Sequence, residues 1–153
     1  MEIERKYLVN ALPDDLDSYP HVDIEQGYLC TSPTLRIRRA GDTYWLTVKE
    51  NVRTNTTAIQ NREEEFLLSP DRYAHLRNKC DGRLVSKTRY RIPLDGGFTA
   101  ELDIFHGPHR GLLLVEVEFP SLQAADHFQP PTWFGSDVSL DPRYRNSILA
   151  LQK

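Results

Sequence analysis

The chain has 153 residues, of which 39% are hydrophobic and 27% are charged, and its 22 acidic and 19 basic residues give a formal net charge of -3. This composition is typical of a globular protein of a single domain, here residues 1–153, and it excludes a disordered chain. The small net charge excludes a general attraction to nucleic acid or to an anionic membrane. No apolar stretch is long enough to span a bilayer and no secretion signal is recognisable, so the cytoplasm is the expected location.

Alternation of polar and apolar residues predicts eight β-strands, with helices between some of them. The expected strands cover residues 2–9, 24–31, 35–40, 43–50, 60–68, 84–92, 98–106 and 112–119. Three helices are expected: from Ser69-Pro70-Asp71 to about residue 79, over 122–128 after Ser121, and from Asp141-Pro142 to about residue 151. The turn at 95–97 is short enough for a hairpin, which makes the sheet largely antiparallel. Trp133 and Phe134 are expected in a packed loop.

Most predicted strands carry two charged residues two positions apart, and such residues share one face of a strand. The first strand places Glu2, Glu4 and Lys6 on one face. On later strands the same spacing gives Arg36, Arg38, Lys49, Glu63, Glu65, Lys87, Arg89, Glu101, Asp103, Glu116 and Glu118. On one strand alone, a solvent-exposed face would explain the pattern. Its recurrence favours a protein that is mainly β with a few helices (α+β): an eight-stranded antiparallel closed barrel with a charged lumen and helices packed outside.

Such a lumen would hold eight carboxylates and six cations. Burying them is costly unless they are hydrated, mutually paired, or satisfied by a ligand that offers both signs. A polyanion carrying Mg²⁺ or Mn²⁺ is such a ligand, because Arg and Lys bind phosphate oxygens and carboxylates bind the cation. The sequence has no GxxxxGKS or GxxxxGKT loop, so side chains of the strands would bind the phosphates. Phosphoryl transfer or hydrolysis is the chemistry that this pattern indicates.

The same residues carry a resemblance to a known family. The motifs are Glu2, Glu4 and Lys6; Gln26-Gly27-Tyr28-Leu29; Arg36-Ile37-Arg38; Leu46-Thr47-Val48-Lys49; Lys87-Thr88-Arg89-Tyr90; Glu101-Leu102-Asp103; and Glu116-Val117-Glu118-Phe119. With the tail 133–146, they resemble the CYTH, or triphosphate tunnel metalloenzyme, family over essentially the whole chain, and in particular its short bacterial inorganic triphosphatases. Two features depart from the family pattern: the loop from Asn51 to Asn61 lacks glycine and serine, and Arg62 faces opposite to its family counterpart.

The resemblance implies metal-dependent hydrolysis of a triphosphate, with inorganic tripolyphosphate split into pyrophosphate and phosphate. It implies metal ligation by Glu2, Glu4, Asp103, Glu116 and Glu118, and phosphate binding by Lys6, Arg36, Arg38, Lys49, Lys87 and Arg89. Glu63, Glu65 and Glu101 would be further tunnel residues. Tyr28 and Lys87 occupy the places of a pair that activates water in some short members, although Tyr28 is equally well explained as an aromatic residue at the barrel rim.

Other members of the family act on thiamine triphosphate, on RNA 5′ ends, or on ATP as class IV-like adenylate cyclases. An organic group needs a pocket for its ring, and Trp45 is a candidate to stack on it, although packing explains Trp45 better. The short chain favours the smallest substrate, inorganic tripolyphosphate. A non-catalytic polyphosphate-binding module and a barrel whose charges only pair with one another are the alternatives. The preferred metal, the oligomeric state and whether both tunnel ends are open are not determined by the sequence.

Overall fold

The structure is a computed structural model that describes residues 1–52 and 58–151. The strands are β1 (Glu2–Val9), β2 (His21–Thr31), β3 (Thr34–Ala40), β4 (Thr43–Asn51), β5 (Ile59–Leu68), β6 (Asp81–Pro93), β7 (Thr99–His106), β8 (Leu113–Glu118) and β9 (Phe134–Asp137). The α-helices are α1 (Pro70–Arg77), α2 (Leu122–His127) and α3 (Asn146–Leu151), and the 3-10 turns are η1 (Leu16–Ser18), η2 (Asp95–Gly97), η3 (Gly107–His109) and η4 (Pro142–Tyr144). Part of the loop from Asn51 to Asn61, whose composition departs from the family, lies outside the described residues.

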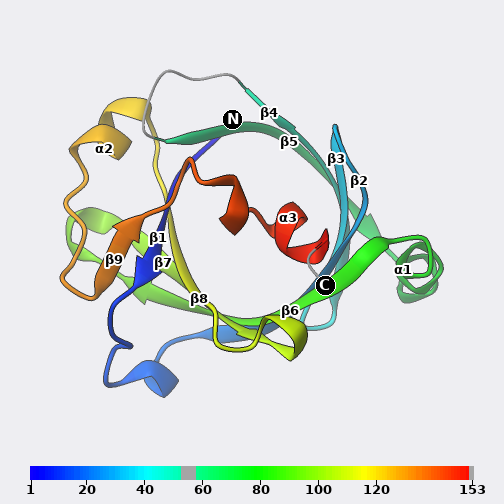
Figure 1. The fold of residues 1–153 in the computed structure, drawn as a ribbon, viewed down its shortest axis with the longest axis horizontal. Helices are drawn as coiled ribbons and strands as arrows, with labels where there is room; N and C mark the ends of the chain where they lie inside the picture. Colours follow the sequence, from blue (N-terminus) through cyan, green and yellow to red (C-terminus); the bar gives the residue numbers. More distant parts are fainter. Residues whose placement is uncertain (53–57, 152–153) are drawn as a thin grey trace.

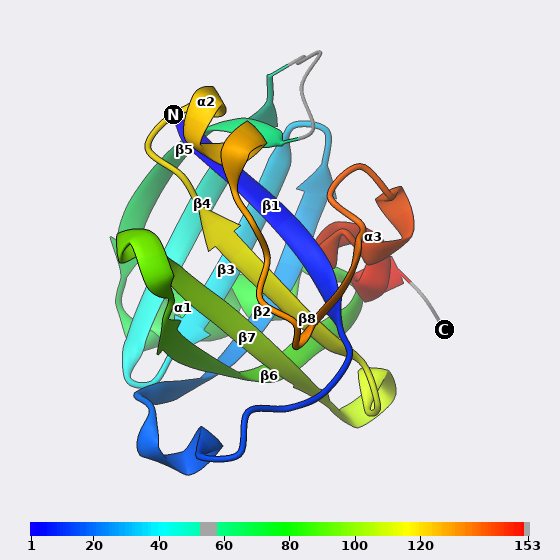
Figure 2. The ribbon, with the colours of Figure 1, turned by 90° about the vertical axis from the view of Figure 1, so that its left-hand side faces the viewer.

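Eight strands close into an antiparallel barrel in the order β5-β4-β3-β2-β6-β7-β8-β1 (Figure 1). The barrel closes at β1, where Glu2 and Glu4 pair with Asn61 and Ile59 of β5. The other edge of β1 pairs with β8, beside which it runs in Figure 2. The predicted eight-stranded antiparallel barrel is therefore confirmed.

A ninth strand, β9, was missed because its sequence, Phe-Gly-Ser-Asp, has no alternation and contains residues typical of turns. It pairs with the far end of β1, through Tyr7 and Val9. The expected loop around Trp133 and Phe134 is therefore wrong from Phe134 onward. A tertiary partner, rather than local propensity, makes this segment a strand.

Apolar side chains form two buried clusters on opposite sides of the barrel wall. Outside the wall, residues of β1, β7 and β8 pack with α2 and β9, among them Tyr7, Leu102, Val115, Phe128 and Phe134. The other cluster contains Tyr28, Val85, Phe105 and Leu114, which pack with Leu149 and Ala150 of α3. Tyr28, Val85, Phe105 and Leu114 lie on the lumen face, opposite or beside charged residues of the same and neighbouring strands. One end of the lumen is therefore apolar and covered by α3, which lies within the ring of strands in Figure 1.

The predicted helices are observed, with one correction. Ser69 and Ser121 accept hydrogen bonds from the third residue after them and begin α1 and α2 as expected. The single C-terminal helix that was predicted is wrong, because Arg145 is extended and separates η4 from α3. This break turns the chain into the barrel end, where Leu149 and Ala150 become buried. No helix in the described part of the chain is long and apolar enough to cross a membrane.

Helix α1 is fastened to the outside of the barrel by Glu25 of β2. The Glu25 carboxylate accepts hydrogen bonds from the Tyr73 hydroxyl at 3.0 Å and from Nε of Arg77 at 2.9 Å. Burial alone would raise the pKa of Glu25, but the hydrogen bonds from Arg77 and Tyr73 outweigh it and lower that pKa. The charged carboxylate therefore stabilises the folded state.

We expect Glu25→Gln to lower the free energy of unfolding at neutral pH by about 1 kcal/mol, since Arg77 is largely exposed and the ion pair is screened. Because the folded-state pKa lies below the unfolded value, this stabilisation is present at neutral pH and is lost as the pH falls through the folded-state pKa. Urea denaturation at neutral pH and at about pH 3 should show the difference from wild type shrinking in acid. Glu64→Gln, which changes an exposed carboxylate of β5, is the control. A difference that grew in acid would contradict this role of Glu25.

Candidate active site

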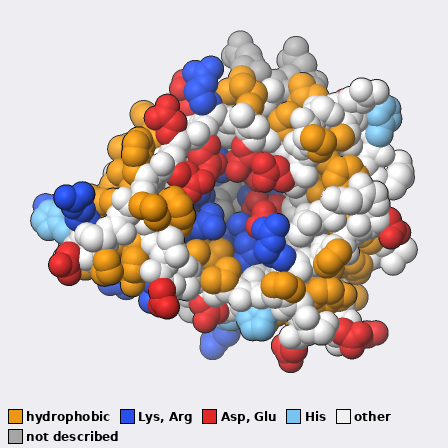
Figure 3. All heavy atoms as spheres, turned by 180° about the vertical axis from the view of Figure 1, so that it is seen from behind, with side chains coloured by type: hydrophobic (Ala, Val, Ile, Leu, Met, Phe, Trp, Pro, Cys, Tyr) orange, Lys and Arg blue, Asp and Glu red, His pale blue; other side chains and the backbone are white. Residues whose placement is uncertain are grey.

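The strand register places the charged pairs of neighbouring strands directly opposite one another on one face. Glu116 of β8 lies opposite both Lys6 of β1 and Glu101 of β7. Arg89 lies opposite Asp103, and further pairs are Glu4 with Glu118 and Lys49 with Glu63. From behind the view of Figure 1, the barrel is hollowed, and acidic and basic side chains line the hollow (Figure 3). The predicted charged lumen is therefore present.

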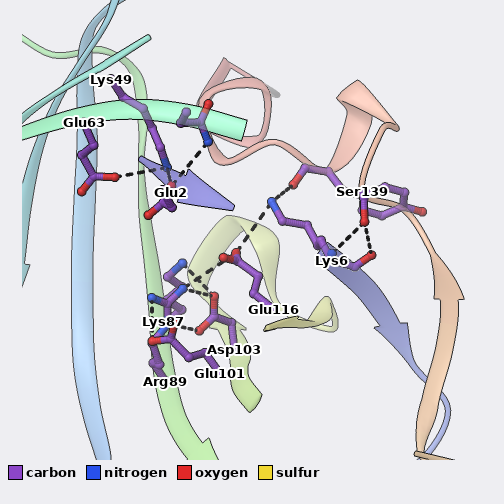
Figure 4. Close-up of polar contacts among 12 residues, drawn as sticks. Glu2, Lys6, Lys49, Glu63, Lys87, Arg89, Glu101, Asp103, Glu116 and Ser139 are labelled. Carbon is purple, nitrogen blue, oxygen red and sulfur yellow. Dashed lines mark hydrogen bonds and ion pairs between the residues drawn. The ribbon is translucent and has the colours of Figure 1, made fainter. Parts of the chain in front are cut away.

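A connected ion network occupies the β6–β8 side of the lumen (Figure 4). Asp103 accepts a hydrogen bond from the Lys87 ammonium at 2.8 Å, and from Nε and Nη2 of Arg89 at 2.8 and 2.9 Å. Arg89 also lies 3.3 Å from Glu101 and 3.8 Å from Glu116. The sequence could predict that these residues share the lumen, and the structure shows that Asp103 is bound by two cations at once.

Burial sets the protonation of Lys87, whose side chain is only 1% exposed. Burial lowers the pKa of Lys87 to about 8, because the neighbouring Asp103 only partly offsets the loss of water. Burial would raise the pKa of Glu116, but Lys6, Arg89 and Lys87 outweigh it and hold that pKa below its usual range. Near neutral pH the network thus combines an ionised Glu116 with a lysine that loses its proton unusually easily.

A second group lies where β1, β4 and β5 meet. The Lys49 ammonium lies 2.9 Å from Glu2 and 3.7 Å from Glu63. Asn61, which is buried, donates a hydrogen bond to Glu2 at 3.4 Å. Figure 4 shows Lys49 between the two carboxylates. Asn61 was not predicted from the sequence, because an uncharged amide on a strand is not distinguished from any other polar residue there.

The carboxylates of β1 and β8 have the right chemistry for a divalent cation, although they are not gathered around one point. Burial, followed by repulsion from Glu116, raises the pKa of Glu4 well above its usual value, and the two side chains share a hydrogen bond. Among the described residues, no three acidic, His or Cys side chains lie close enough together to form a cation site. Glu2 is held by Lys49, and Asp103 by Lys87 and Arg89. Carboxylate oxygens of this kind are the ligands that Mg²⁺ or Mn²⁺ prefers, so the chemistry of the donor set fits such a cation.

Four buried donor groups on three adjacent strands lack a hydrogen-bond partner among the described residues. They are Nε of Arg36, Nε of Arg38, Nε2 of Gln26 and Oγ1 of Thr47. Arg36 lies opposite Thr47 and Arg38 lies opposite Gln26, so all four side chains share the lumen face. Neither arginine forms an ion pair within the described part of the protein, unlike the other four predicted cations. We call these four residues the donor patch.

Electrostatic repulsion between cations in the lumen adds to the cost of leaving the donor patch without partners. Burial lowers the pKa of Arg38, and the nearby positive charges of Arg36 and Arg89 lower it further. Unsatisfied buried donors and crowded cations both cost free energy. An anion with many acceptor oxygens would satisfy the donor patch.

Tyr28 lies at the apolar end of the lumen rather than in the ion network. It is 2% exposed and belongs to the cluster that contains Phe105, and the Lys87 ammonium lies 5.4 Å from the Phe105 ring centroid. Burial raises the pKa of Tyr28, and the charge of Arg36 only partly opposes this. The described contacts include no hydrogen bond between Tyr28 and Lys87. Their action as a pair therefore stays a prediction.

Arg62 and Trp45 have no described contact with the ion network. Arg62 points outward, 4.0 Å from Glu50, with both side chains more than 60% exposed. Arg62 therefore faces away from the lumen, as its position on the strand predicts. Trp45 is half-buried opposite Arg38.

A cavity of about 340 Å³ at the mouth is lined by Arg91, Gly96, Gly97, Phe98, Thr99, Glu101, Glu118 and Pro120. Burial, followed by the charges of Glu2 and Glu101, raises the pKa of Glu118 there.

Comparison with known proteins identifies close relatives of the whole chain. An inorganic triphosphatase of Nitrosomonas europaea is 43% identical over 155 residues, which cover 98% of this chain and 97% of that protein. An inorganic triphosphatase of Acetivibrio thermocellus is 34% identical over 97% of this chain and 92% of its own. The crystal structure of the inorganic triphosphatase NE1496 matches with a TM-score of 0.74 and 39% identity, over 100% of this chain and 96% of that one. No family model matches the chain.

Proposed function

The chain belongs to the inorganic triphosphatase family, and from this premise we propose that it hydrolyses inorganic tripolyphosphate to pyrophosphate and phosphate. We further propose that it is a triphosphate tunnel metalloenzyme of the CYTH type that uses Mg²⁺ or Mn²⁺. The reaction joins a water oxygen to the terminal phosphorus, breaks the bridging P–O bond and releases pyrophosphate as the leaving group.

The donor patch is the observation that carries this proposal. Each of its four side chains faces the lumen with one buried polar atom, Nε of Arg36, Nε of Arg38, Nε2 of Gln26 or Oγ1 of Thr47, that has no hydrogen-bond partner among the described residues. Phosphate oxygens accept several hydrogen bonds each, and guanidinium groups bind them strongly. In this proposal Arg36 and Arg38 bind the phosphate chain, and Gln26 and Thr47 add hydrogen bonds that involve no net charge. The last two residues were missed from the sequence, although both lie within motifs that resemble the family.

The opposite side of the lumen supplies the other half of the proposed chemistry. The divalent cation would be held by Glu2, Glu4, Glu116 and Glu118. Asp103 would become a further ligand if Lys87 and Arg89, which it now binds, bound the substrate instead. The bound cation would neutralise phosphate oxygens and favour charge build-up on the leaving group. Lys6, Lys49 and Arg89 are paired with carboxylates that would hold the cation. With those carboxylates engaged by the cation, the three cationic side chains would be free to bind phosphate oxygens. Lys87, in its neutral form, would accept a proton from the attacking water.

A substrate panel tests the proposal. Tripolyphosphate, thiamine triphosphate, ATP and a longer polyphosphate are each incubated with Mg²⁺ and with Mn²⁺, and released phosphate is measured. We expect the highest kcat/KM for tripolyphosphate and no turnover after chelation of the metal. A higher kcat/KM for ATP with cyclic AMP as product would contradict the choice of substrate.

The same panel separates the enzyme from the alternatives. A polyphosphate-binding module would be stabilised against heat by tripolyphosphate, because a ligand of the folded state raises the Tm, but it would release no phosphate. A barrel whose charges only pair internally would show neither effect. Thiamine triphosphatase activity would require a ring pocket, and a Trp45→Ala variant would then lose thiamine triphosphate turnover selectively.

A further inference from the structure

Strand β1 changes its edge partner in the middle of its acid, acid, base motif. Glu2 and Glu4 pair with β5, whereas the far end of β1 pairs with β9. Lys6 lies between these two pairings. Its backbone N–H donates to Oγ of Ser139 at 2.9 Å, and its carbonyl accepts from the N–H of Val138 at 2.8 Å. The two acids and the lysine of one motif are therefore held by different parts of the chain.

Ser139 is itself fixed by Asp137 of β9, which Arg5 of β1 holds in turn. Its hydroxyl donates to Oδ1 of Asp137 at 2.5 Å, and its N–H donates to the same oxygen at 2.8 Å. Asp137 also accepts hydrogen bonds from Nε and Nη2 of Arg5 at 3.2 and 2.8 Å. Ser139 is 5% exposed, so water does not readily replace it as the acceptor for Lys6.

The far end of the Lys6 side chain is held by the same C-terminal segment. Its ammonium donates to the carbonyl oxygen of Tyr144 at 3.0 Å, and it lies 3.7 Å from Glu116. Figure 4 shows Lys6 between Ser139 on one side and Glu116 on the other. Both the backbone and the ammonium of Lys6 are thus placed by residues 138–144. The acids of the motif have no such contact in the described structure.

We propose that Ser139 is a positioning residue that fixes where the Lys6 ammonium lies relative to the phosphate chain. It does so independently of the carboxylates that would hold the metal. The inference rests on the proposed function, since Lys6 needs a phosphate in the lumen to act on. Losing the Ser139 acceptor removes one of the two hydrogen bonds that residues 138 and 139 make to the β1 backbone at Lys6, where the strand no longer pairs with β5. Lys6 then loses alignment, whereas Glu2 and Glu4 stay paired with β5.

The test compares Ser139→Ala, Ser139→Thr and Ser139→Cys with the control Ser136→Ala, which changes an exposed serine of β9. Tripolyphosphate KM, kcat, the half-saturating Mg²⁺ concentration and the Tm are measured for each. We expect Ser139→Ala to raise KM about fivefold to tenfold, the effect of one misplaced charged contact, with kcat and the Mg²⁺ requirement nearly unchanged. Thr, which keeps the hydroxyl, should restore a wild-type KM, and Cys, a weaker acceptor, should be intermediate.

Binding of tripolyphosphate measured by calorimetry without metal keeps this inference separate from the proposed function. If the wild type binds tripolyphosphate without turning it over, the proposed function fails, and the ratio of Kd between Ser139→Ala and wild type still tests the positioning role. A lower Tm with unchanged KM and Kd would show a purely structural role and overturn the inference. If Ser139→Ala does not fold, Ser139→Cys decides: a wild-type KM and Kd in that variant would overturn it equally.

Discussion

Replacing Glu4 by Gln is expected to reduce metal-dependent turnover on the order of 10²-fold or more, the scale of losing one electrostatic element of a preorganised site. The amide keeps the size of the side chain and its hydrogen bonding to Glu116 but cannot supply a negative charge to the cation. The Mg²⁺ concentration needed for half-maximal rate should rise. Steady-state kinetics over a Mg²⁺ titration measures both effects.

The same substitution should not weaken the metal-free fold. Burial and repulsion by Glu116 raise the pKa of Glu4, so its ionised form destabilises the folded state. A raised carboxyl pKa means that stability falls as the pH rises from the unfolded-state pKa toward the folded-state value. In the presence of a chelator, the Tm of Glu4→Gln should therefore equal or exceed the Tm of wild type at neutral pH and above.

Glu64→Gln is the matched control for Glu4→Gln, because it makes the same chemical change on the exposed outer face of β5. Its turnover and its Mg²⁺ dependence should both equal those of wild type. If Glu4→Gln also left both at wild-type values, Glu4 would not be a metal ligand. The strand motif would then need another explanation.

Replacing Lys87 by Ala is expected to lower kcat about 10²-fold to 10⁴-fold, the range of a lost general base. The fold should survive, because Asp103 keeps both of its hydrogen bonds from Arg89. Lys79→Ala, at an exposed lysine beyond α1, is the control and should change neither kcat nor KM. A kcat within twofold of wild type for Lys87→Ala, with only KM raised, would leave Lys87 as a phosphate-binding residue alone.

The pH dependence of kcat/KM distinguishes the two roles of Lys87, because it reports the free enzyme. Burial lowers the pKa of Lys87 to about 8, so its neutral form grows as the pH rises through that value. A base must be neutral to accept a proton, and kcat/KM should then rise and level off above about pH 8. A role that needs the charged ammonium predicts the opposite, a fall through the same range.

Much of the candidate site could be predicted from sequence, because the face on which a strand residue lies follows from the two-residue period of the backbone. The pairs Glu2 and Glu4, Arg36 and Arg38, and Glu116 and Glu118 could therefore be assigned to one surface. The closed barrel followed from finding that surface charged on so many strands. Gln26 and Thr47 lie on the same face but were not predicted as site residues. The sequence does not distinguish an uncharged side chain that is solvated from one that binds a ligand.

The sequence by itself thus determined the eight strands of the barrel, the side of each of these strands that faces the lumen and the resemblance to triphosphate-hydrolysing relatives. Only the tertiary structure decided which charges neutralise one another, because ion pairing depends on the register between neighbouring strands and on side-chain conformation, which alternation within one strand does not specify. It places two cations on Asp103 and leaves Arg36 and Arg38 without an ion partner among the described residues. It also decided that α3 covers one end of the lumen and that Ser139 holds Lys6. The contact between Ser139 and Lys6 joins residues 133 positions apart, and local alternation carries no information about it.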